Sequence, residues 1–191
     1  MSITLSQRLK ALHISGRTVF TASDLKSIWK TIPHNSTIIA RRMQDKELIV
    51  KIAKGYYALN LDYNKNELAN LIVRPSYVSF NSALFHWSVC FQQQSIIRSV
   101  ALINYEKSIQ SFTYSYHAMK SILFYDLRGV VVQNNIAIAS PERALLDSLY
   151  FGFLANIDNE SVINFTFLKK LMTLYPMTTQ EKIKETYGEH L

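Results

Sequence analysis

The sequence predicts an α+β protein with two domains, residues 1–62 and residues 63–191. Three observations lead to this prediction. The first sixty residues contain three segments of helical periodicity followed by two short β-rich runs. The rest of the chain alternates helical segments with runs rich in β-branched and aromatic residues. Apolar residues make up 48% of the 191 residues and charged residues 18%, which is typical of globular domains rather than disordered chains.

Two amphipathic helices are expected at the N-terminus. In "TLSQRLKALH" the residues Leu5, Leu9 and Leu12 recur at helical spacing, while the polar residues between them face outward. A second helix is expected over "FTASDLKSIW". Thr21 is placed to be its N-cap, and Asp24 three residues later completes a carboxylate variant of the capping box.

A third helix and a hairpin complete the first domain. The helix is expected over "TIIARRMQDKE", with Asn35 or Ser36 as its N-cap. Two β-rich runs, "LIVKIA" and "YYALN", follow around a turn at Lys54 and Gly55, where glycine permits a positive φ. Three short helices followed by a hairpin are the element order of a winged helix-turn-helix. We therefore expect this fold for residues 1–62.

The second domain is expected to be mixed α+β with an antiparallel-type sheet. The segment "LDYNKNELANLIV" is a candidate linker, and Ser79 is placed to cap the next helix. Strands are expected in "IIRSVALI", "SFTYSYHA", "SILFYDL" and "GVVVQNNIAIA", the last with a hairpin turn at Asn134 and Asn135. Ser140 is then placed to cap the helix "SPERALLDSLYFGFL". Two short helices are expected after Asp158.

The positive charge of the chain is concentrated at its N-terminal end. The net charge is +7. Residues 1–60 hold ten Lys and Arg but only three acids, whereas residues 61–191 hold eleven of each. The whole excess therefore lies in the first domain. Such an asymmetry is expected when one domain meets a polyanion and the other does not.

The third helix and the hairpin carry the residue types that recognise double-stranded DNA. Arg and Gln side chains read base edges in the major groove, Ser and Thr can donate to a phosphate or a base, and Lys contacts phosphates. A lysine at a hairpin turn can reach a phosphate or a minor groove. The candidate DNA-binding residues are Ser36, Thr37, Arg41, Arg42, Gln44 and Lys46 in the helix, and Lys51, Lys54 and Tyr56 in the hairpin.

A nuclease is the strongest enzymatic alternative, and the sequence argues against it. The acid-x-Lys arrangement of metal-dependent nucleases occurs once, at Asp24-Leu25-Lys26, where no acid precedes Asp24 in the chain. Helix capping explains this aspartate better. The chain also has no Gly-rich phosphate loop, and no glycine is followed by serine as a nucleotidyltransferase signature requires.

Histidine and cysteine usage indicates no metal site or disulfide. The five histidines are scattered, and Cys90 is the only cysteine and is expected to be buried. His86 is expected in the core or at its boundary, and not as a catalytic residue. His117 ends an aromatic strand and is expected to have a structural role. In the alternative, it faces a cleft together with Tyr114 and Tyr116. We expect no enzymatic activity, no cofactor and no metal. Without a signal peptide or a membrane-span segment, the chain is expected in the cytoplasm, away from membranes.

Several segments resemble a known family. The stretch "STIIARRMQDKELIVKIAKGYYAL" resembles the end of the winged-helix domain of AbiEi-type antitoxins, where a recognition helix leads into a Gly-Tyr-containing wing. "PSYVSFNSALFHWSV", "FTYSYHA" and "IAIASPERALLDSLYF" resemble further motifs of the family, in the family's order. The resemblance covers roughly residues 5 to 152. Arg143 stands where the family pattern has Lys, and the region after Asp158 has no counterpart.

The resemblance implies a function. The N-terminal module would bind the operator of its own operon and repress it, and the C-terminal domain would antagonise a co-encoded nucleotidyltransferase-like toxin. Such proteins belong to abortive-infection or type IV toxin–antitoxin loci, in which the antitoxin acts without a stable complex with the toxin. The alternative is a stand-alone winged-helix transcriptional regulator whose second domain senses a ligand or a protein partner.

Overall fold

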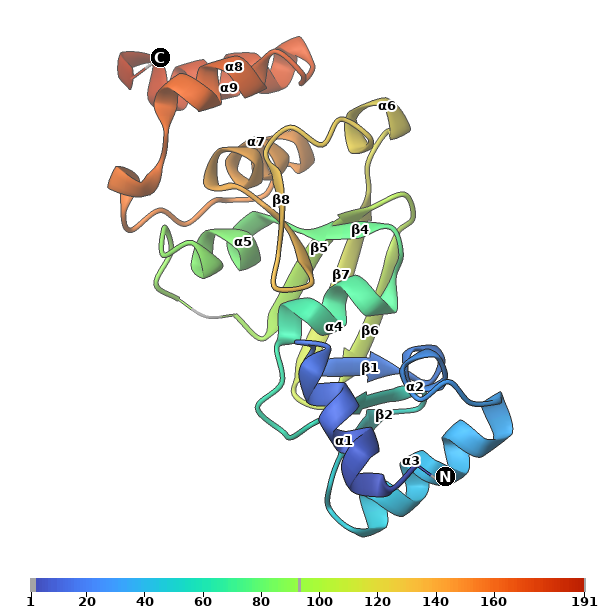
Figure 1. Ribbon diagram of the computed structural model, residues 1–191. Helices are drawn as coiled ribbons and strands as arrows, with labels where there is room; N and C mark the ends of the chain where they lie inside the picture. The colour runs from blue at the N-terminus through green and yellow to red at the C-terminus, as the bar shows by residue number, and fades with distance from the viewer. Residues whose placement is uncertain (1–2, 93, 191) are drawn as a thin grey trace. The chain divides into compact units, whose positions relative to one another are not determined.

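A computed structural model describes residues 3–92 and 94–190 (Figure 1). The chain divides into two compact units, Met1–Leu71 and Ile72–Leu191. Both units combine helices and strands, so the α+β class predicted from the sequence is confirmed. No helix in the described part of the chain is both long and apolar enough to cross a membrane.

The first unit contains four helices and three strands among its described residues. The strands form an antiparallel sheet in the order β1-β3-β2. The strand β1 was not predicted, because three residues are too few to give a periodic signal. The elements are α1 (Leu5–Ile14), β1 (Val19–Thr21), α2 (Ala22–Ile28), α3 (Pro33–Asp45), β2 (Val50–Ala53), β3 (Tyr56–Ala58) and α4 (Lys65–Ile72).

The helices α1, α2 and α3 and the sheet enclose one apolar core. The start of α2 is fixed by the capping box predicted from the sequence, in which Asp24 N donates to Thr21 Oγ1 at 3.1 Å and Thr21 N donates to Asp24 Oδ2 at 2.8 Å. Burial opposes ionisation of Asp24, but hydrogen bonds from Thr21 and the nearby Arg17 hold the pKa of this carboxyl below its ordinary value. The buried core residues are Leu12, Phe20, Leu25, Trp29, Ala40, Met43, Ile49 and Tyr57.

The helix α3 begins earlier than the sequence predicted. Neither Asn35 nor Ser36 is its N-cap; the helix begins at Pro33, and Ile32 occupies the N-cap position without a side-chain hydrogen bond. Proline is tolerated at the first helical position because the N–H that it lacks has no partner there in any case. Ser36 N already donates to Ile32 O at 3.0 Å, within the first turn.

The predicted linker forms a packed helix, α4. Glu67 is only 3% exposed, and its Oε2 accepts hydrogen bonds from Thr18 N at 2.9 Å and from Thr18 Oγ1 at 2.6 Å. These bonds fasten α4 to the start of β1. The first unit consequently extends to Leu71, beyond the boundary at residue 62 that the sequence suggested.

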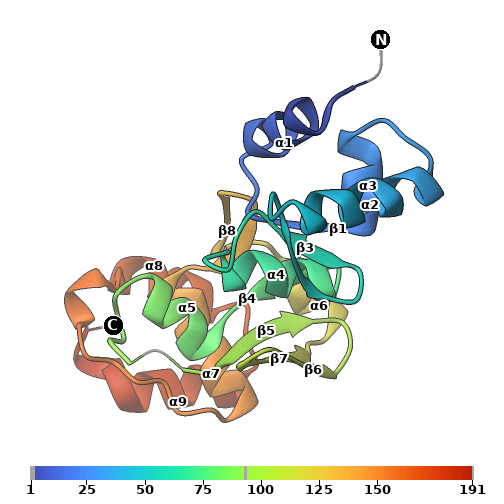
Figure 2. The same cartoon turned by 90° about the horizontal axis from the view of Figure 1, so that it is seen from below.

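The second unit contains a six-stranded sheet with helices on it. The strand order is β6-β7-β5-β4-β9-β8, and Figure 2 shows β5, β7 and β6 following one another. The elements are β4 (Ser76–Val78), α5 (Phe80–His86), β5 (Ile96–Ala101), β6 (Tyr105–Ile109), β7 (Phe112–Ala118), α6 (Ser121–Phe124), β8 (Val130–Gln133), β9 (Ile136–Ala139), α7 (Pro141–Phe151), α8 (Phe165–Met172) and α9 (Met177–Tyr187).

This sheet is mixed, which corrects the expectation of an antiparallel-type sheet. The pairs β4–β9 and β5–β7 are parallel, while β4–β5, β6–β7 and β8–β9 are antiparallel. The strand β7 lies between β5 and β6, parallel to β5 and antiparallel to β6. The segment "SILFYDL", expected as a strand, forms the short helix α6 instead. Short apolar runs do not distinguish helix from strand, and here Leu123 and Phe124 are buried side by side rather than alternating.

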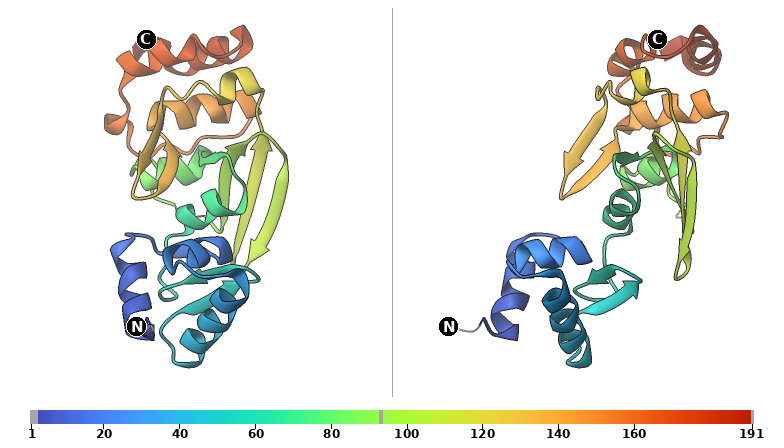
Figure 3. Two further views of the ribbon diagram at one scale, coloured as in Figure 1. Left: turned by 45° about the vertical axis from the view of Figure 1, so that its right-hand side comes forward. Right: turned by 90° about the vertical axis from the view of Figure 1, so that its right-hand side faces the viewer.

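The helix α7 is the centre of the second unit. The helices α5 and α7 pack on the sheet, and α8 and α9 pack on α7, so that they lie beyond it in Figure 3. Ser140 caps α7 as predicted, with its Oγ accepting from Arg143 N at 3.3 Å. Glu142 joins α7 to the start of α8, because its Oε1 accepts from Asn164 N at 2.7 Å.

A buried ion pair lies on α7. Arg143 and Asp147 are both 0% exposed, with 3.5 Å between Nε and Oδ1. Asp147 Oδ2 accepts from Ser79 Oγ at 2.6 Å and from Tyr77 OH at 3.1 Å, and its Oδ1 accepts from Tyr175 OH at 2.6 Å. Ser79 therefore uses its hydroxyl for this contact and not to cap α5, although it stands at the predicted N-cap position. Burial and the nearby carboxylate raise the pKa of both tyrosines, which keeps them as donors.

His117 packs among aromatic rings on the other face of β7 from the tyrosines. Its ring centroid lies 5.4 Å from that of Phe80 and 4.9 Å from that of Phe153. Alternate residues of a strand face opposite sides, so the interpretation that His117 shares a cleft with Tyr114 and Tyr116 is wrong. Both tyrosines are buried on the opposite face.

The His117→Gln variant should be less sensitive to acid than the natural chain. Burial, and then the charge of Arg98, lower the pKa of His117 below its ordinary value of 6.5. The unfolded chain therefore takes up this proton at a higher pH than the folded chain. The free energy of unfolding falls as the pH drops below 6.5 and levels off below the folded pKa.

Urea unfolding between about pH 8 and pH 5 would measure this slope. His86, whose pKa is also lowered by burial, remains in the variant, so the slope should shrink without vanishing. The exposed His13 offers a matched control, because His13→Gln makes the same substitution at a surface position. Equal slopes for His117→Gln and the natural chain would contradict the prediction.

Candidate nucleic-acid interface

The helix α3 buries one stripe and exposes the rest of its surface. Ser36, Ala40 and Met43 recur at helical spacing and face the core, at 3%, 1% and 0% exposure. Of the residues between them, Thr37, Ile38, Arg41 and Arg42 are exposed, whereas Ile39 is half-buried against the core. Five of the predicted basic contacts are exposed, namely Arg41, Arg42, Lys46, Lys51 and Lys54.

The side chains of the other predicted contacts differ in their exposure. Thr37 is exposed on α3, and Tyr56 is half-buried on β3. Gln44 is half-buried, and its Nε2 donates to Ala40 O at 3.1 Å. Ser36 lies on the buried stripe of α3. The structure therefore exposes the basic residues and Thr37, and it buries Ser36.

The hairpin of β2 and β3 is tied to the beginning of α2. Gly55 has a φ of +85°, which is the conformation for which a glycine was expected at this turn. Gly55 O accepts from Ala22 N at 3.1 Å, so the turn is held beside the first residue of α2. A register shift between Lys51 and Ala53 bends the hairpin. Lys54 is therefore exposed on a short turn that a hydrogen bond to α2 holds in place.

A groove between α1 and α3 adds residues that the sequence did not single out. Its volume is about 510 Å³, and Arg8, Asn35 and Arg42 contribute polar side chains to it. The guanidinium carbon of Arg8 lies 5.8 Å from the ring centroid of Trp29. Its Nη1 is buried and has no hydrogen-bond partner among the described residues. The full lining is Ile3, Thr4, Leu5, Arg8, Thr31, Asn35, Ile38, Ile39 and Arg42.

The charge of this groove is favourable for an anion. No acid is present among its nine lining residues, and two arginines are. Sequence reasoning placed Arg8 on the outward face of the first helix. It missed the groove because α1 and α3 are far apart in the chain, so no local spacing reveals that they lie side by side.

Ile38 is a further surface residue without a sequence signal. It is 39% exposed on α3, although apolar helix residues are assigned to the core by default. An exposed apolar side chain on such a helix can contact the methyl group of thymine.

Acids near this surface are few. Asp24 is paired with Arg17 at 2.9 Å, which leaves Asp45 and Glu47 as the exposed acids of residues 1–60. The surface made by α3, the hairpin turn and the α1–α3 groove therefore carries cations, threonine hydroxyls and the exposed isoleucines Ile3 and Ile38. This set of groups can bind phosphates and base edges.

Among known proteins, no family model matches the chain, and no curated protein is significantly similar to it.

Proposed function

We propose that the chain is a DNA-binding antitoxin and transcriptional autorepressor of a type IV toxin–antitoxin operon. In this proposal Met1–Leu71 is a winged helix-turn-helix that binds the chain's own operator. The observation that carries the DNA-binding part is the exposed basic surface of α3 and the hairpin. The antitoxin part rests on the sequence resemblance.

The order of elements supports a winged helix-turn-helix. The helices α2 and α3 are separated by residues 29–32, a connection of the length that joins the two helices of a helix-turn-helix. In such motifs the second helix enters the major groove. The hairpin β2–β3 follows at once and pairs with β1, as expected of a wing attached to the helices.

The distribution of charge supports double-stranded DNA as the ligand. Phosphate contacts from Lys and Arg supply most of the affinity of such proteins, and base contacts supply specificity. Arg41, Arg42 and Thr37 are exposed on one helix, which is narrow enough to enter a major groove. The lysines of the hairpin then meet the backbone beside it.

Direct binding of the full chain to DNA tests this proposal. A labelled duplex from the region upstream of the gene would be compared by fluorescence anisotropy with a scrambled duplex of equal length. We expect tighter binding to the upstream duplex and a steep loss of affinity between about 50 and 200 mM salt. Equal affinity for both duplexes, or binding to neither, would refute operator recognition.

Lys54→Ala should weaken binding to specific and scrambled duplexes by the same factor. A lysine on the turn contacts phosphate, which carries no sequence information. The slope of log affinity against log salt should become shallower by about 0.9, the value for one phosphate contact. Lys184→Ala, on the exposed surface of α9, removes the same charge and should leave the slope unchanged. A loss confined to the upstream duplex would reassign Lys54 to base reading.

Co-expression tests the antitoxin part. The adjacent gene would be expressed with the full chain, with residues 1–71 and with residues 72–191, and growth would be scored. We expect rescue by the full chain and no co-purification of the two proteins. If the adjacent reading frame lacks a nucleotidyltransferase signature, the antitoxin proposal fails.

A stand-alone regulator is the second candidate, and one observation favours it. The unit Ile72–Leu191 contains a pocket lined by Arg98 and several carboxamides, which is suited to a small ligand. A regulator of this kind would bind its operator in the same way, but would lack an adjacent toxin gene.

A further inference from the structure

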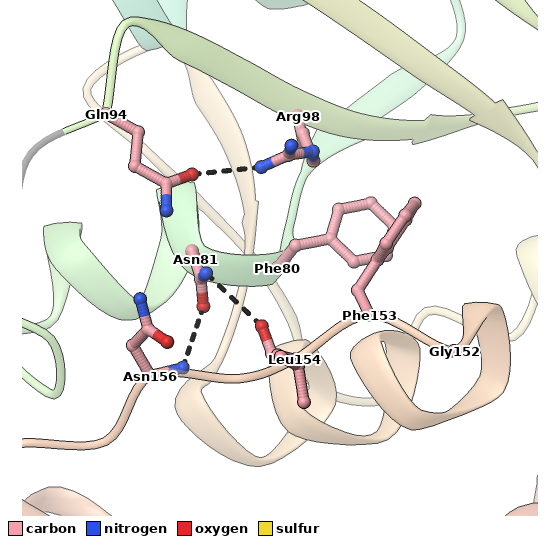
Figure 4. Close-up of a pocket in the computed structure, with 8 residues that line it drawn as sticks. All are labelled: Phe80, Asn81, Gln94, Arg98, Gly152, Phe153, Leu154 and Asn156. Atoms are coloured by element: carbon pink, nitrogen blue, oxygen red, sulfur yellow. Dashed lines mark hydrogen bonds between the residues drawn. The ribbon is translucent and has the colours of Figure 1, made fainter.

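A pocket of about 320 Å³ lies within the second unit (Figure 4). Three segments surround it: the start of α5, the chain that leads into β5, and the chain that leaves α7. Figure 4 shows the side chains of Gln94 and Arg98 on one side and those of Asn81 and Asn156 on another. The lining residues are Phe80, Asn81, Gln94, Arg98, Gly152, Phe153, Leu154 and Asn156.

Hydrogen bonds hold the walls of this pocket in place. Asn81 is 8% exposed; its Nδ2 donates to Leu154 O at 3.3 Å, and its Oδ1 accepts from Asn156 N at 3.1 Å. Gly152, with a φ of +75°, ends α7 and turns the chain toward Asn81. Phe80 has a φ of +56°, which is a strained conformation for a bulky residue, and such strain is concentrated at functional sites.

Arg98 supplies the charge of the pocket. It lies on β5, where its backbone N–H donates to Ser82 Oγ at 2.9 Å, so its position is fixed by the sheet. Its Nη1 donates to Gln94 Oε1 at 2.9 Å, and its guanidinium carbon lies 5.5 Å from the ring centroid of Phe153. A guanidinium has five N–H donors, so this bond leaves others for a ligand. No acid is present among the eight lining residues to neutralise the charge.

The charge of Arg98 also acts on its surroundings. After burial, it is the second cause of the lowered pKa of His117, whose ring packs against Phe80 and Phe153 in the wall of the pocket. A cation that no lining carboxylate pairs with attracts an oxyanion. The neighbouring carboxamides can both donate and accept hydrogen bonds, so they suit a polar ligand and not an apolar one.

We propose that this pocket binds a small polar oxyanion, a metabolite that carries a carboxylate or phosphate group. Arg98 would contact the anionic group, and the carboxamides of Gln94 and Asn156 would hydrogen-bond to it or to adjacent polar groups. The volume lies at the lower end of about 300–1,000 Å³ for small-molecule sites, which fits a small molecule. The site lies wholly within Ile72–Leu191, so it does not depend on DNA binding by the first unit.

Anion titrations of the full chain test the proposal. Inorganic phosphate and succinate would be titrated separately by calorimetry, with chloride at equal ionic strength as the reference. We expect at least one of the two probes to bind in excess of chloride, and the comparison distinguishes a phosphate site from a carboxylate site. Arg98→Gln should weaken that binding about tenfold or more, since it removes a charge-assisted hydrogen bond. Arg74→Gln removes an exposed arginine of the same unit and should change the affinity by less than about twofold.

A second variant keeps the test decisive if Arg98→Gln is poorly folded. Asn156→Asp adds a carboxylate to the pocket while leaving the backbone bond to Asn81 and the charge of Arg98 in place. It should lose anion binding at an unchanged melting temperature. The proposal is overturned if neither probe binds in excess of chloride, if Arg74→Gln loses as much affinity as Arg98→Gln, or if Asn156→Asp binds like the natural chain. DNA binding by the same preparations reports on the proposed function separately.

Discussion

Asp147→Asn should lower the free energy of unfolding of the second unit by about 3–5 kcal/mol, the cost of breaking a buried ion pair from one side. The substitution keeps the shape of the side chain but removes its charge. Arg143 is 0% exposed, so its cation would then stay buried without a counter-ion. The hydroxyls of Ser79, Tyr77 and Tyr175 would also lose an ionised acceptor.

The two tryptophans allow this loss to be measured in the correct unit. Trp29 lies in the core of the first unit, whereas Trp87 donates from Nε1 to Ala139 O at 2.7 Å in the second. In a Trp29→Phe background, urea unfolding followed by fluorescence reports on Trp87 alone.

A surface ion pair gives the matched control. Asp126 pairs with the exposed Arg128 at 2.6 Å, and exposed pairs contribute little to stability because water already solvates both charges. Asp126→Asn in the same background should therefore leave the urea midpoint unchanged. If Asp147→Asn shifts the midpoint no more than Asp126→Asn does, the buried pair is not the stabilising element inferred from the structure.

Removing both charges should lower the free energy of unfolding by less than the sum of the losses caused by the two single substitutions. Arg143→Met combined with Asp147→Leu leaves no buried ion uncompensated. Recovery should be incomplete, because Arg143 also donates to the carbonyl oxygens of Asp126, Arg128 and Leu123, and the double variant leaves these unsatisfied. The segment "IASPERALLD", the most specific of the segments that carry the sequence resemblance, thus contains residues whose contacts in this structure lie within the core.

Local signals in the sequence were reliable where neighbouring residues alone decide the structure. The capping box of Thr21 and Asp24 is an example, since its atoms lie within one helical turn. The hairpin turn at Asn134 and Asn135 is another, because both residues adopt the positive φ that asparagine tolerates. Ser140 capping α7 belongs with these.

Features that depend on distant residues were not predictable in the same way. The hydroxyl of Ser79 donates to a carboxylate 68 positions away in the chain and does not cap α5. The parallel pairing of β5 with β7 depends on where β6 is placed, which no local pattern encodes. The α1–α3 groove and the pocket at Arg98 are further cases, since each is lined by segments far apart in the sequence. Exposure of the basic residues on α3 followed from helical spacing, whereas the burial of Ser36 did not enter the prediction.

Replacing Arg41 and Arg42 together by alanine should weaken binding to the upstream duplex at least about thirtyfold. A good arginine contact to a base contributes about 1–3 kcal/mol, and about 1.4 kcal/mol corresponds to a tenfold change in affinity. Adjacent residues of a helix point about 100° apart. Arg42 lines the groove beside Arg8, so Arg41 must meet a different part of the duplex. The single variants should therefore differ in how far each of them weakens binding to the upstream duplex.

A control variant that loses two positive charges elsewhere distinguishes sequence recognition by α3 from general electrostatic attraction to DNA. Lys182→Ala with Lys184→Ala removes two exposed cations from α9, in the second unit, and should leave the affinity for the upstream duplex within about twofold. Both double variants should unfold at the temperature of the natural chain, because none of the four side chains is buried. If the Arg41 and Arg42 variant shifts the duplex in a gel as the natural chain does, α3 is not the recognition helix. If the control loses as much affinity, the attraction is general and the proposed operator contact at α3 fails with it.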